Sequence, residues 1–340
     1  MIWVYYEYDF RIACTKQGIP IQEQNKLLYY AKYLYDSNLP IIFDANHLSC
    51  FVGYNINLLY SISNCQHYYY RKFFIQKKNG KQREINEPYT TLKEIQYWIL
   101  NNLLENIKPS IFAKAYIKNG KLTNNVKFHK KQNIVIKIDI VDFFQSISAK
   151  QIFYLIYDLG YTKSVASLIA NLCCLNSGLP QGAPTSPYLS NLFAKSLDKR
   201  IGNYVISKGY RYTRYSDDIT ISGDIDREEV GKIISTIKII LKDFDLSINK
   251  NKLRVLRNSN RQVVTGIIVN NRKLSISREV KKKIRQEVYY IDKYGLDSHI
   301  KFIKEHRGNY LNHLRGKVNW VLTIEKNNDE FKKYKDILSK

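Results

Sequence analysis

The sequence predicts an α+β protein, and three observations support this fold class. Residues 1 to about 65 and residues 276–340 have the spacing and composition of helices joined by short connections. Two segments, 67–88 and 211–223, each contain two strand-like runs around turn residues, which is typical of β-hairpins. A further strand-like run, Ile134–Ile140, lies between them. At 340 residues the chain is long enough to form two or three subdomains.

The overall charge predicts a polyanionic partner. The chain has 54 Lys and Arg against 30 Asp and Glu, a formal net charge of +24, and many of its 28 tyrosines stand among basic residues. Such mixtures suit a nucleic-acid strand, whose phosphates pair with cations and whose bases stack on aromatic rings. Half-buried packing is the alternative role for any single tyrosine.

Several other classes are disfavoured. The sequence contains no run of about eighteen apolar residues, which a membrane span would need. Glu7 and Asp9 interrupt the N-terminal segment where a signal peptide would be apolar, so we expect a cytoplasmic protein without membrane contact. The five cysteines offer no CxxC spacing, which argues against a zinc site.

The first helical region is followed by a basic stretch with its own hairpin. HYYYRKFFIQ has the composition of a strand, NGK of a turn and QREINEP of the returning strand. The next segment has Leu92, Ile95 and Leu103 at helical spacing and predicts an amphipathic helix.

Three carboxylates stand in otherwise apolar, strand-like surroundings. In IVIKIDI the alternation places the isoleucines on one buried face and Asp139 on the opposite, open face. In RYTRYSDDITISG two strand-like runs flank Ser216 and Asp217, so a tight hairpin should hold Asp217 and Asp218 at its tip. Side by side, carboxylates about 4 Å apart would repel by roughly 4 kcal/mol, which divalent cations would reverse. An Asp-Asp pair on its own more often serves only to form a turn, but the third acid favours a metal site.

Between these acids lies SGLPQGAPTSPYLSNLFAKSLDKRI, which predicts a stiff loop opening a helix. Its glycines and prolines make a close-approach turn, Ser186 is a suitable N-cap and Pro187 a suitable first helical residue. A helix cap alone explains Ser186 and Pro187, but the preceding Pro-Gln-Gly indicates a place to hold a base or phosphate.

In this order and spacing, IKIDIVDFF, LPQGAPTSP and YSDD resemble the central motifs of reverse transcriptases, and KKNGKQREINEP resembles their fingers hairpin. The resemblance extends from about residue 65 to the end. It implies a right-hand polymerase with fingers, a palm built on an antiparallel sheet, a helical thumb and here a helical N-terminal extension. The corresponding regions are 1–65 for the extension, 66–125 for the fingers, 126–275 for the palm, with part of the fingers inserted around 150–185, and 276–340 for the basic thumb.

The resemblance also assigns roles to residues. Asp139, Asp217 and Asp218 would hold two Mg²⁺ ions, which can activate an attacking hydroxyl and stabilise the leaving pyrophosphate. Lys252, in FDLSINKNKLRVL, would assist as proton donor, or would be an ordinary surface lysine. The residues implied to contact the incoming deoxynucleotide are Lys77, Arg83, Phe144 and Gln181. Phe144 would act as the steric gate against a ribose 2'-hydroxyl, although Phe143 or Phe144 could be a plain core aromatic.

Two further segments resemble those of retron reverse transcriptases. The segment NVKFH, Asn125–His129, is similar to their NAxxH motif with Val126 in place of Ala, and Val264, Thr265 and Gly266 match their VTG. The resemblance implies that these residues bind RNA, whereas His129 on its own would more often be structural. YSDD also replaces the commoner YADD, and neither change removes a metal ligand.

The implied activity is RNA-directed DNA synthesis that copies a structured noncoding RNA into single-stranded DNA, the msDNA. Synthesis would start from the 2'-hydroxyl of a guanosine in that RNA, in anti-phage defence with a separate effector protein. The alternatives are another bacterial reverse transcriptase, of group II intron or stand-alone defence type, and a noncatalytic RNA-binding scaffold. The three intact acids argue against a scaffold, which gains nothing from buried negative charge near phosphates.

Overall fold

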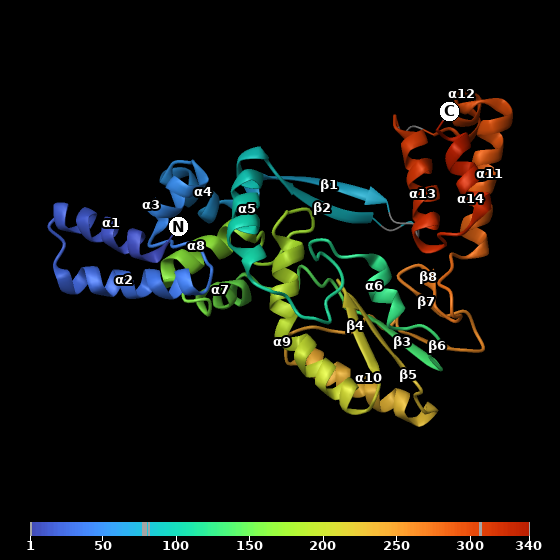
Figure 1. The fold of residues 1–340 in the computed structure, drawn as a ribbon, viewed down its shortest axis with the longest axis horizontal. Coiled ribbons are helices and arrows are strands. Elements are labelled where there is room, and N and C mark those ends of the chain that lie inside the picture. The colour runs from blue at the N-terminus through green and yellow to red at the C-terminus, as the bar shows by residue number, and fades with distance from the viewer. Residues whose placement is uncertain (1, 77–79, 81, 306–307, 340) are drawn as a thin grey trace. The chain divides into compact units, whose positions relative to one another are not determined.

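A four-stranded antiparallel sheet is the largest sheet of the described residues (Figure 1), and the three predicted acids lie at the ends of two of its strands and in a turn between two of its strands. The computed structural model describes all residues except 1, 77–79, 81, 306–307 and 340. The strand order is β4 (Arg211–Tyr215), β5 (Asp218–Gly223), β3 (Ile134–Asp139) and β6 (Arg254–Arg257). The antiparallel pairing of β4 with β5 confirms the predicted hairpin, and β3 confirms the predicted strand before Asp139.

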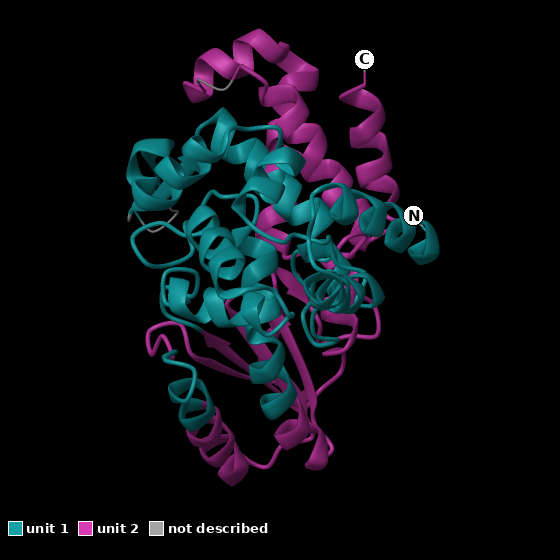
Figure 2. Ribbon diagram, turned by 90° about the vertical axis from the view of Figure 1, so that its left-hand side faces the viewer, with its two compact units in different colours: residues 1–117, 140–201, 238–247 teal, residues 118–139, 202–237, 248–340 magenta. Residues whose placement is uncertain are grey.

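The chain forms two units, which Figure 2 shows in different colours. Unit 1 consists of residues 1–117, 140–201 and 238–247, and unit 2 of residues 118–139, 202–237 and 248–340. These units cut across the four regions expected from the sequence, and the four-region division stays a prediction. The sheet with its acids belongs to unit 2.

Unit 1 begins with the expected helices and contains the basic hairpin. Its elements are α1 (Trp3–Lys16), α2 (Ile21–Asp36), α3 (Ala45–Val52), α4 (Ile56–Asn64), the 3-10 turn η1 (Gln66–Tyr69), β1 (Tyr70–Gln76), β2 (Gln82–Pro88), α5 (Thr90–Asn102), the 3-10 turn η2 (Leu104–Asn106), α7 (Ala149–Tyr157) and α8 (Lys163–Cys173). Strands β1 and β2 pair antiparallel, with Ile75 opposite Arg83, so the predicted hairpin is confirmed. Lys77 lies outside the described residues.

Helices α9 (Ser186–Ser207) and α10 (Arg227–Lys242) each run from one unit into the other. Helix α9 begins one residue before Pro187, the first helical residue expected from the sequence. The buried hydroxyl of Ser186 has no hydrogen-bond partner among the described residues, so this side chain is not the cap that the sequence suggests. Buried Leu189, Leu197 and Ile201 account for the apolar face of α9.

Unit 2 has an apolar core of its own, formed largely by its C-terminal elements and called the second core below. Its remaining elements are α6 (Leu122–Lys127), β7 (Val263–Val264), β8 (Ile267–Ile268), α11 (Arg278–Tyr294), α12 (Leu296–Ile303), α13 (Tyr310–Ile324) and α14 (Asp329–Ile337). The core includes Val126 from α6, Val135 from β3, Val264 from β7 and Val318 from α13. Val135 is therefore buried, and the face of β3 expected to be open is not open along its whole length. Among the described residues, no helix is both long and apolar enough to cross a membrane.

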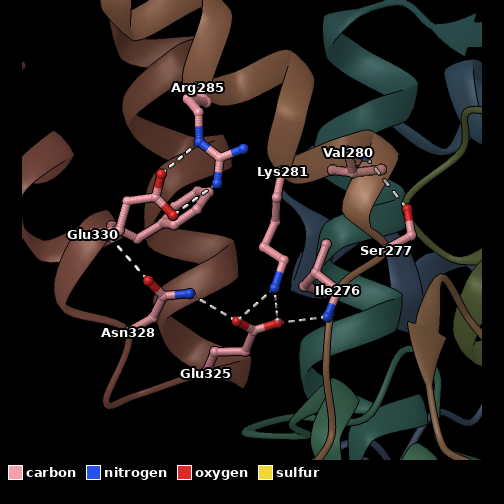
Figure 3. A network of polar contacts seen from close by, with 9 residues as sticks. Ile276, Ser277, Val280, Lys281, Arg285, Glu325, Asn328 and Glu330 are labelled. Atoms are coloured by element: carbon pink, nitrogen blue, oxygen red, sulfur yellow. Dashed lines mark hydrogen bonds and ion pairs between the residues drawn. The ribbon is translucent and has the colours of Figure 1, made fainter.

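A polar network joins α11 to the connection between α13 and α14 (Figure 3). The carboxylate of Glu325 accepts hydrogen bonds from the Ile276 N–H at 2.8 Å, from Lys281 Nζ at 3.1 Å and from Asn328 Nδ2 at 2.8 Å. Burial alone would raise the pKa of Glu325, but these hydrogen bonds outweigh it and lower the pKa. The network holds the C-terminal helices together with charges that are partly shielded from solvent.

Candidate active site

Asp217 and Asp218 are presented by a two-residue turn. Strand β4 ends at Tyr215 and β5 begins at Asp218, so Ser216 and Asp217 form the turn. Ser216 has φ of +60°, the left-handed backbone that such tight turns require. Nη1 of the fully buried Arg214 donates to the Ser216 carbonyl at 3.0 Å, which braces the turn from within the sheet.

Asp139 ends the neighbouring strand and lies opposite Asp218 in the β3–β5 register. Its side chain is only 8% exposed. Lys252 Nζ lies 2.7 Å from Asp139 Oδ2, and Asn249 Nδ2 donates to Oδ1 at 3.1 Å. The Asn249 N–H also donates to the Asp139 carbonyl at 2.8 Å, which places the chain just before β6 beside the end of β3. The predicted convergence of the three acids is therefore present within unit 2.

The electrostatics of this cluster are those of acids that repel one another. Burial raises the pKa of Asp217, and the negative charge of Asp139 adds to the rise. Burial also raises the pKa of Asp218, where the charge of Lys137 opposes the effect and the charges of Asp217 and Asp139 reinforce it. The hydrogen bond to Asp139 raises the pKa of Lys252, with further contributions from the other two acids. The cluster is stabilised by positive charge, and Lys252 supplies one such charge.

The donor set fits a divalent cation such as Mg²⁺. Carboxylate oxygens are the ligands this ion prefers, and a bound cation would offset both the burial and the mutual repulsion that raise the pKa values of Asp217 and Asp218. In the part of the chain that the structure describes, no three His, Cys, Asp or Glu side chains are already grouped as a complete metal site. In this structure the positive charge next to Asp139 is that of Lys252, whose Nζ lies 2.7 Å from Asp139 Oδ2.

The nucleotide-contact candidates that the structure describes, Arg83, Phe144 and Gln181, belong to unit 1. The Gln181 carbonyl accepts a hydrogen bond from the Asn86 N–H of β2 at 2.7 Å, and Gln181 Nε2 lies 3.4 Å from Gln145 Oε1. The loop thus joins the hairpin to the segment that carries Phe144. Arg83 is exposed on β2.

Two glycines allow the close approach of this loop. Gly182 has φ of +129°, and a Cβ there would lie 2.6 Å from the Asn86 carbonyl oxygen. A Cβ at Gly178 would lie 2.6 Å from the Gln145 carbonyl oxygen. Only glycine fits at these contacts without a backbone shift, which explains the glycines in the stiff loop.

The structure separates the two phenylalanines after Asp139. Phe143 is buried, whereas Phe144 is partly exposed and has its ring centroid 6.3 Å from that of Tyr116. Phe143 is therefore the core aromatic of the pair. Phe144 remains partly exposed, and its role as the steric gate stays a prediction.

Asn125 and His129 are fully buried, and their side chains bond to the sheet. Thr213 Oγ1 donates to Asn125 Oδ1 at 2.6 Å, so this hydroxyl accepts from His129 Nε2, 2.8 Å away. His129 Nδ1 then accepts from Ser222 Oγ at 2.7 Å. Burial, with the charge of Arg211, lowers the pKa of His129 to about 3, so the ring is neutral. These contacts correspond to the structural role weighed for His129, and they leave neither side chain a surface on which to meet RNA.

The VTG segment spans the end of β7 and the turn to β8, with Val264 in the strand and Thr265 and Gly266 in the turn. Val264 is fully buried in the second core, Thr265 has φ of +45° and Gly266 is exposed. In the part of the chain that the structure describes, the buried hydroxyl of Thr265 has no hydrogen-bond partner.

Sequence reasoning did not identify Asn249 or Arg214. Asn249 lies three residues before Lys252, and only the pairing of β6 with β3 reveals that it reaches Asp139. Arg214 is one of several arginines in a basic chain, and its complete burial has no signal in the sequence. The position of each of these two residues can be recognised only once the pairing of the strands is known.

Comparison with known proteins identifies the family of the chain. Residues 75–306 match the family model described as reverse transcriptase (RNA-dependent DNA polymerase). The chain belongs to the reverse transcriptase family.

Retron enzymes are among its curated relatives. It is 31% identical over 289 residues to the Retron Ec86 reverse transcriptase of Escherichia coli, covering 84% of this chain and 86% of that protein. It is 32% identical over 243 residues to the Retron Ec73 reverse transcriptase of Escherichia coli, covering 66% of this chain and 76% of that one. Within the family, the chain is therefore a retron-type reverse transcriptase, an RNA-directed DNA polymerase.

Among solved structures, a telomerase from Candida albicans with a fragment of telomeric RNA aligns over 79% of this chain and 62% of its own, with a TM-score of 0.46 and 9% identity.

Proposed function

We propose that this enzyme copies a structured region of its own noncoding RNA into single-stranded DNA, with Asp139, Asp217 and Asp218 as its catalytic acids. The observation that carries the proposal is the register of β3 and β5, which sets Asp139 opposite Asp218 with Lys252 at 2.7 Å. Family membership supports dependence on a divalent metal, and the acids would hold two Mg²⁺ ions. When bound, these ions would activate the primer hydroxyl and stabilise the pyrophosphate.

The remaining candidate residues would have the following roles. Lys252, charged and hydrogen-bonded to Asp139, stands beside the acids and would deliver a proton to the leaving pyrophosphate. Arg83, with Lys77, would pair with the triphosphate. Phe144 would exclude a 2'-hydroxyl by occupying its space. Gln181, fixed by the bond between its carbonyl and Asn86, would lie against the nucleotide.

The proposed priming and biological context rest on the resemblance to retron enzymes. Synthesis would begin from the 2'-hydroxyl of a guanosine in the RNA and would leave a branched RNA-DNA product. A separate effector protein would complete an anti-phage system. Recognition of the RNA would fall to the segments around Asn125–His129 and Val264–Gly266.

Primer extension on an RNA template tests the polymerase proposal. The wild type should extend a DNA primer only with Mg²⁺, and Asp217→Asn should lower the rate by at least about a thousandfold, because a metal ligand is lost. Asp243→Asn, at an exposed acid on unit 1, is the matched control and should extend normally. Extension that persists in Asp217→Asn would contradict the site, and its absence in the wild type would favour the scaffold alternative.

Analysis of co-purified nucleic acid tests the priming proposal. DNA that stays joined to RNA until a debranching enzyme is added would support the 2'-linkage. DNA with a free 5' end would contradict it.

A further inference from the structure

The amide of Asn249 reaches the acid cluster from the segment between α10 and β6. Asn249 is partly buried, and its Nδ2 donates to Asp139 Oδ1 at 3.1 Å. Lys252 Nζ lies at the other oxygen of the same carboxylate, 2.7 Å from Asp139 Oδ2. Two residues of one short segment therefore hold the Asp139 carboxylate, one at each oxygen.

Main-chain hydrogen bonds fix the position of Asn249. Its N–H donates to the Asp139 carbonyl at 2.8 Å, close to the pairing of β3 with β6. Its carbonyl accepts from the N–H groups of Lys252 and Leu253 at 3.0 and 3.1 Å. These three bonds use only backbone atoms of Asn249, so they do not depend on the side chain at this position. Within the described residues, the bond to Asp139 Oδ1 is the one that the Asn249 side chain makes.

The two contacts to the Asp139 carboxylate differ in how they respond to a cation. The side chain of Lys252 is positively charged and 59% exposed, so a divalent cation at Oδ2 would repel it towards solvent. The amide of Asn249 is neutral, and its backbone is held in place, so it has no such reason to leave Oδ1. Asn249 is therefore the contact that Asp139 can keep when a metal ion is bound.

We propose that Asn249 is a positioning residue, which holds the Asp139 carboxylate so that Oδ2 is the oxygen left for the divalent cation. The proposal rests on the proposed function, because it takes Asp139 as a metal ligand. A carboxylate can turn about its Cβ–Cγ bond and can offer a cation one oxygen or both. A donor at Oδ1 restricts this freedom before the ion binds. Hydrogen bonds that orient metal ligands typically change metal affinity or activity by about 10- to 100-fold when they are lost.

The test removes the amide and leaves the backbone bonds of position 249 in place. Asn249→Ala deletes the donor, and Asn249→Ser deletes it while keeping a residue that favours turns. The control, Asn251→Ala, removes the same group from an exposed position in the same segment. Each protein is bound to an RNA template with a dideoxy-terminated DNA primer and the matching deoxynucleotide, so that no extension occurs. The probe is Mn²⁺, whose free ion is measured by electron paramagnetic resonance, with uptake by the nucleotide and nucleic acid alone subtracted.

Both Asn249 variants should bind Mn²⁺ about 10-fold or more weakly than the wild type, and Asn251→Ala should bind it like the wild type. With an extendable primer, the Asn249 variants should need a correspondingly higher Mg²⁺ concentration for half of their maximal rate. Saturating Mg²⁺ should restore most of that rate. Equal Mn²⁺ affinity in the wild type and the Asn249 variants would overturn the proposal. A rate that falls by the same factor at every Mg²⁺ concentration would also overturn it, because the amide would then support only the fold.

The wild type distinguishes a failure of this proposal from a failure of the proposed function. A wild-type complex that takes up no Mn²⁺ and extends no primer would show that the three acids are not a metal site, and the proposed function would fail with the positioning role. A wild type that binds Mn²⁺ and extends primers, with Asn249 variants that do so at the same metal concentrations, would remove only the positioning role of Asn249.

Discussion

Mild acid should destabilise this protein through one buried side chain, His129. The ring accepts from Ser222 and donates to Thr213, an arrangement that only the neutral imidazole can make. Protonation would place two donors where one acceptor is needed and would leave a charge without solvent. The unfolded chain has no such constraint and titrates near the ordinary value of 6.5.

The size of the effect follows from proton linkage. The folded pKa of about 3 lies below the unfolded one, so between these values the unfolded state binds the proton and the folded state does not. The contribution of His129 is therefore fully present above pH 6.5 and is lost as the pH falls. Between pH 7.5 and pH 5 the loss is about 2 kcal/mol, and it reaches about 4 kcal/mol near pH 3.

Urea unfolding at a series of pH values measures this contribution of His129 to the free energy of unfolding. The nontitrating variant for comparison is His129→Gln. The wild type should lose about 2 kcal/mol more than His129→Gln between pH 7.5 and pH 5. His313→Gln, at an exposed histidine, serves as the control and should follow the wild type. Parallel curves for the wild type and His129→Gln would refute the assignment of a neutral, buried His129.

Three other substitutions test the sites. Lys252→Ala should lower the extension rate by about a hundredfold, because the proton donor beside Asp139 is lost; an unchanged single-turnover rate would remove Lys252 from that role. Phe144→Val should raise ribonucleotide relative to deoxynucleotide incorporation in a competition assay, whereas unchanged sugar selectivity would exclude Phe144 as the gate. Gly182→Ala should destabilise the protein by about 1–3 kcal/mol in urea unfolding, since its Cβ would meet the Asn86 carbonyl at 2.6 Å; a stability equal to that of the wild type would show that the contact relaxes freely.

Local sequence patterns were sufficient to predict the elements that contain the three proposed catalytic acids. Period-two alternation identified β3, and the Ser-Asp turn identified the β4–β5 hairpin, because both signals lie within a few residues. Val135 was misjudged as facing an open side, since the residues that cover it, such as Val264 and Val318, come from distant parts of the chain. The partners of His129 could not be predicted for the same reason, as they are 84 and 93 residues away.

The joint burial of Val126 and Val264 has a consequence for engineering. Either segment, transplanted alone from a relative with a different side chain at that point, would arrive without its complementary packing surface. A chimera that exchanges residues 121–133 and 262–269 together would keep the two halves matched. We therefore expect the two segments to be exchangeable only as a pair, even though they lie on either side of the Ser216–Asp217 turn in the sequence.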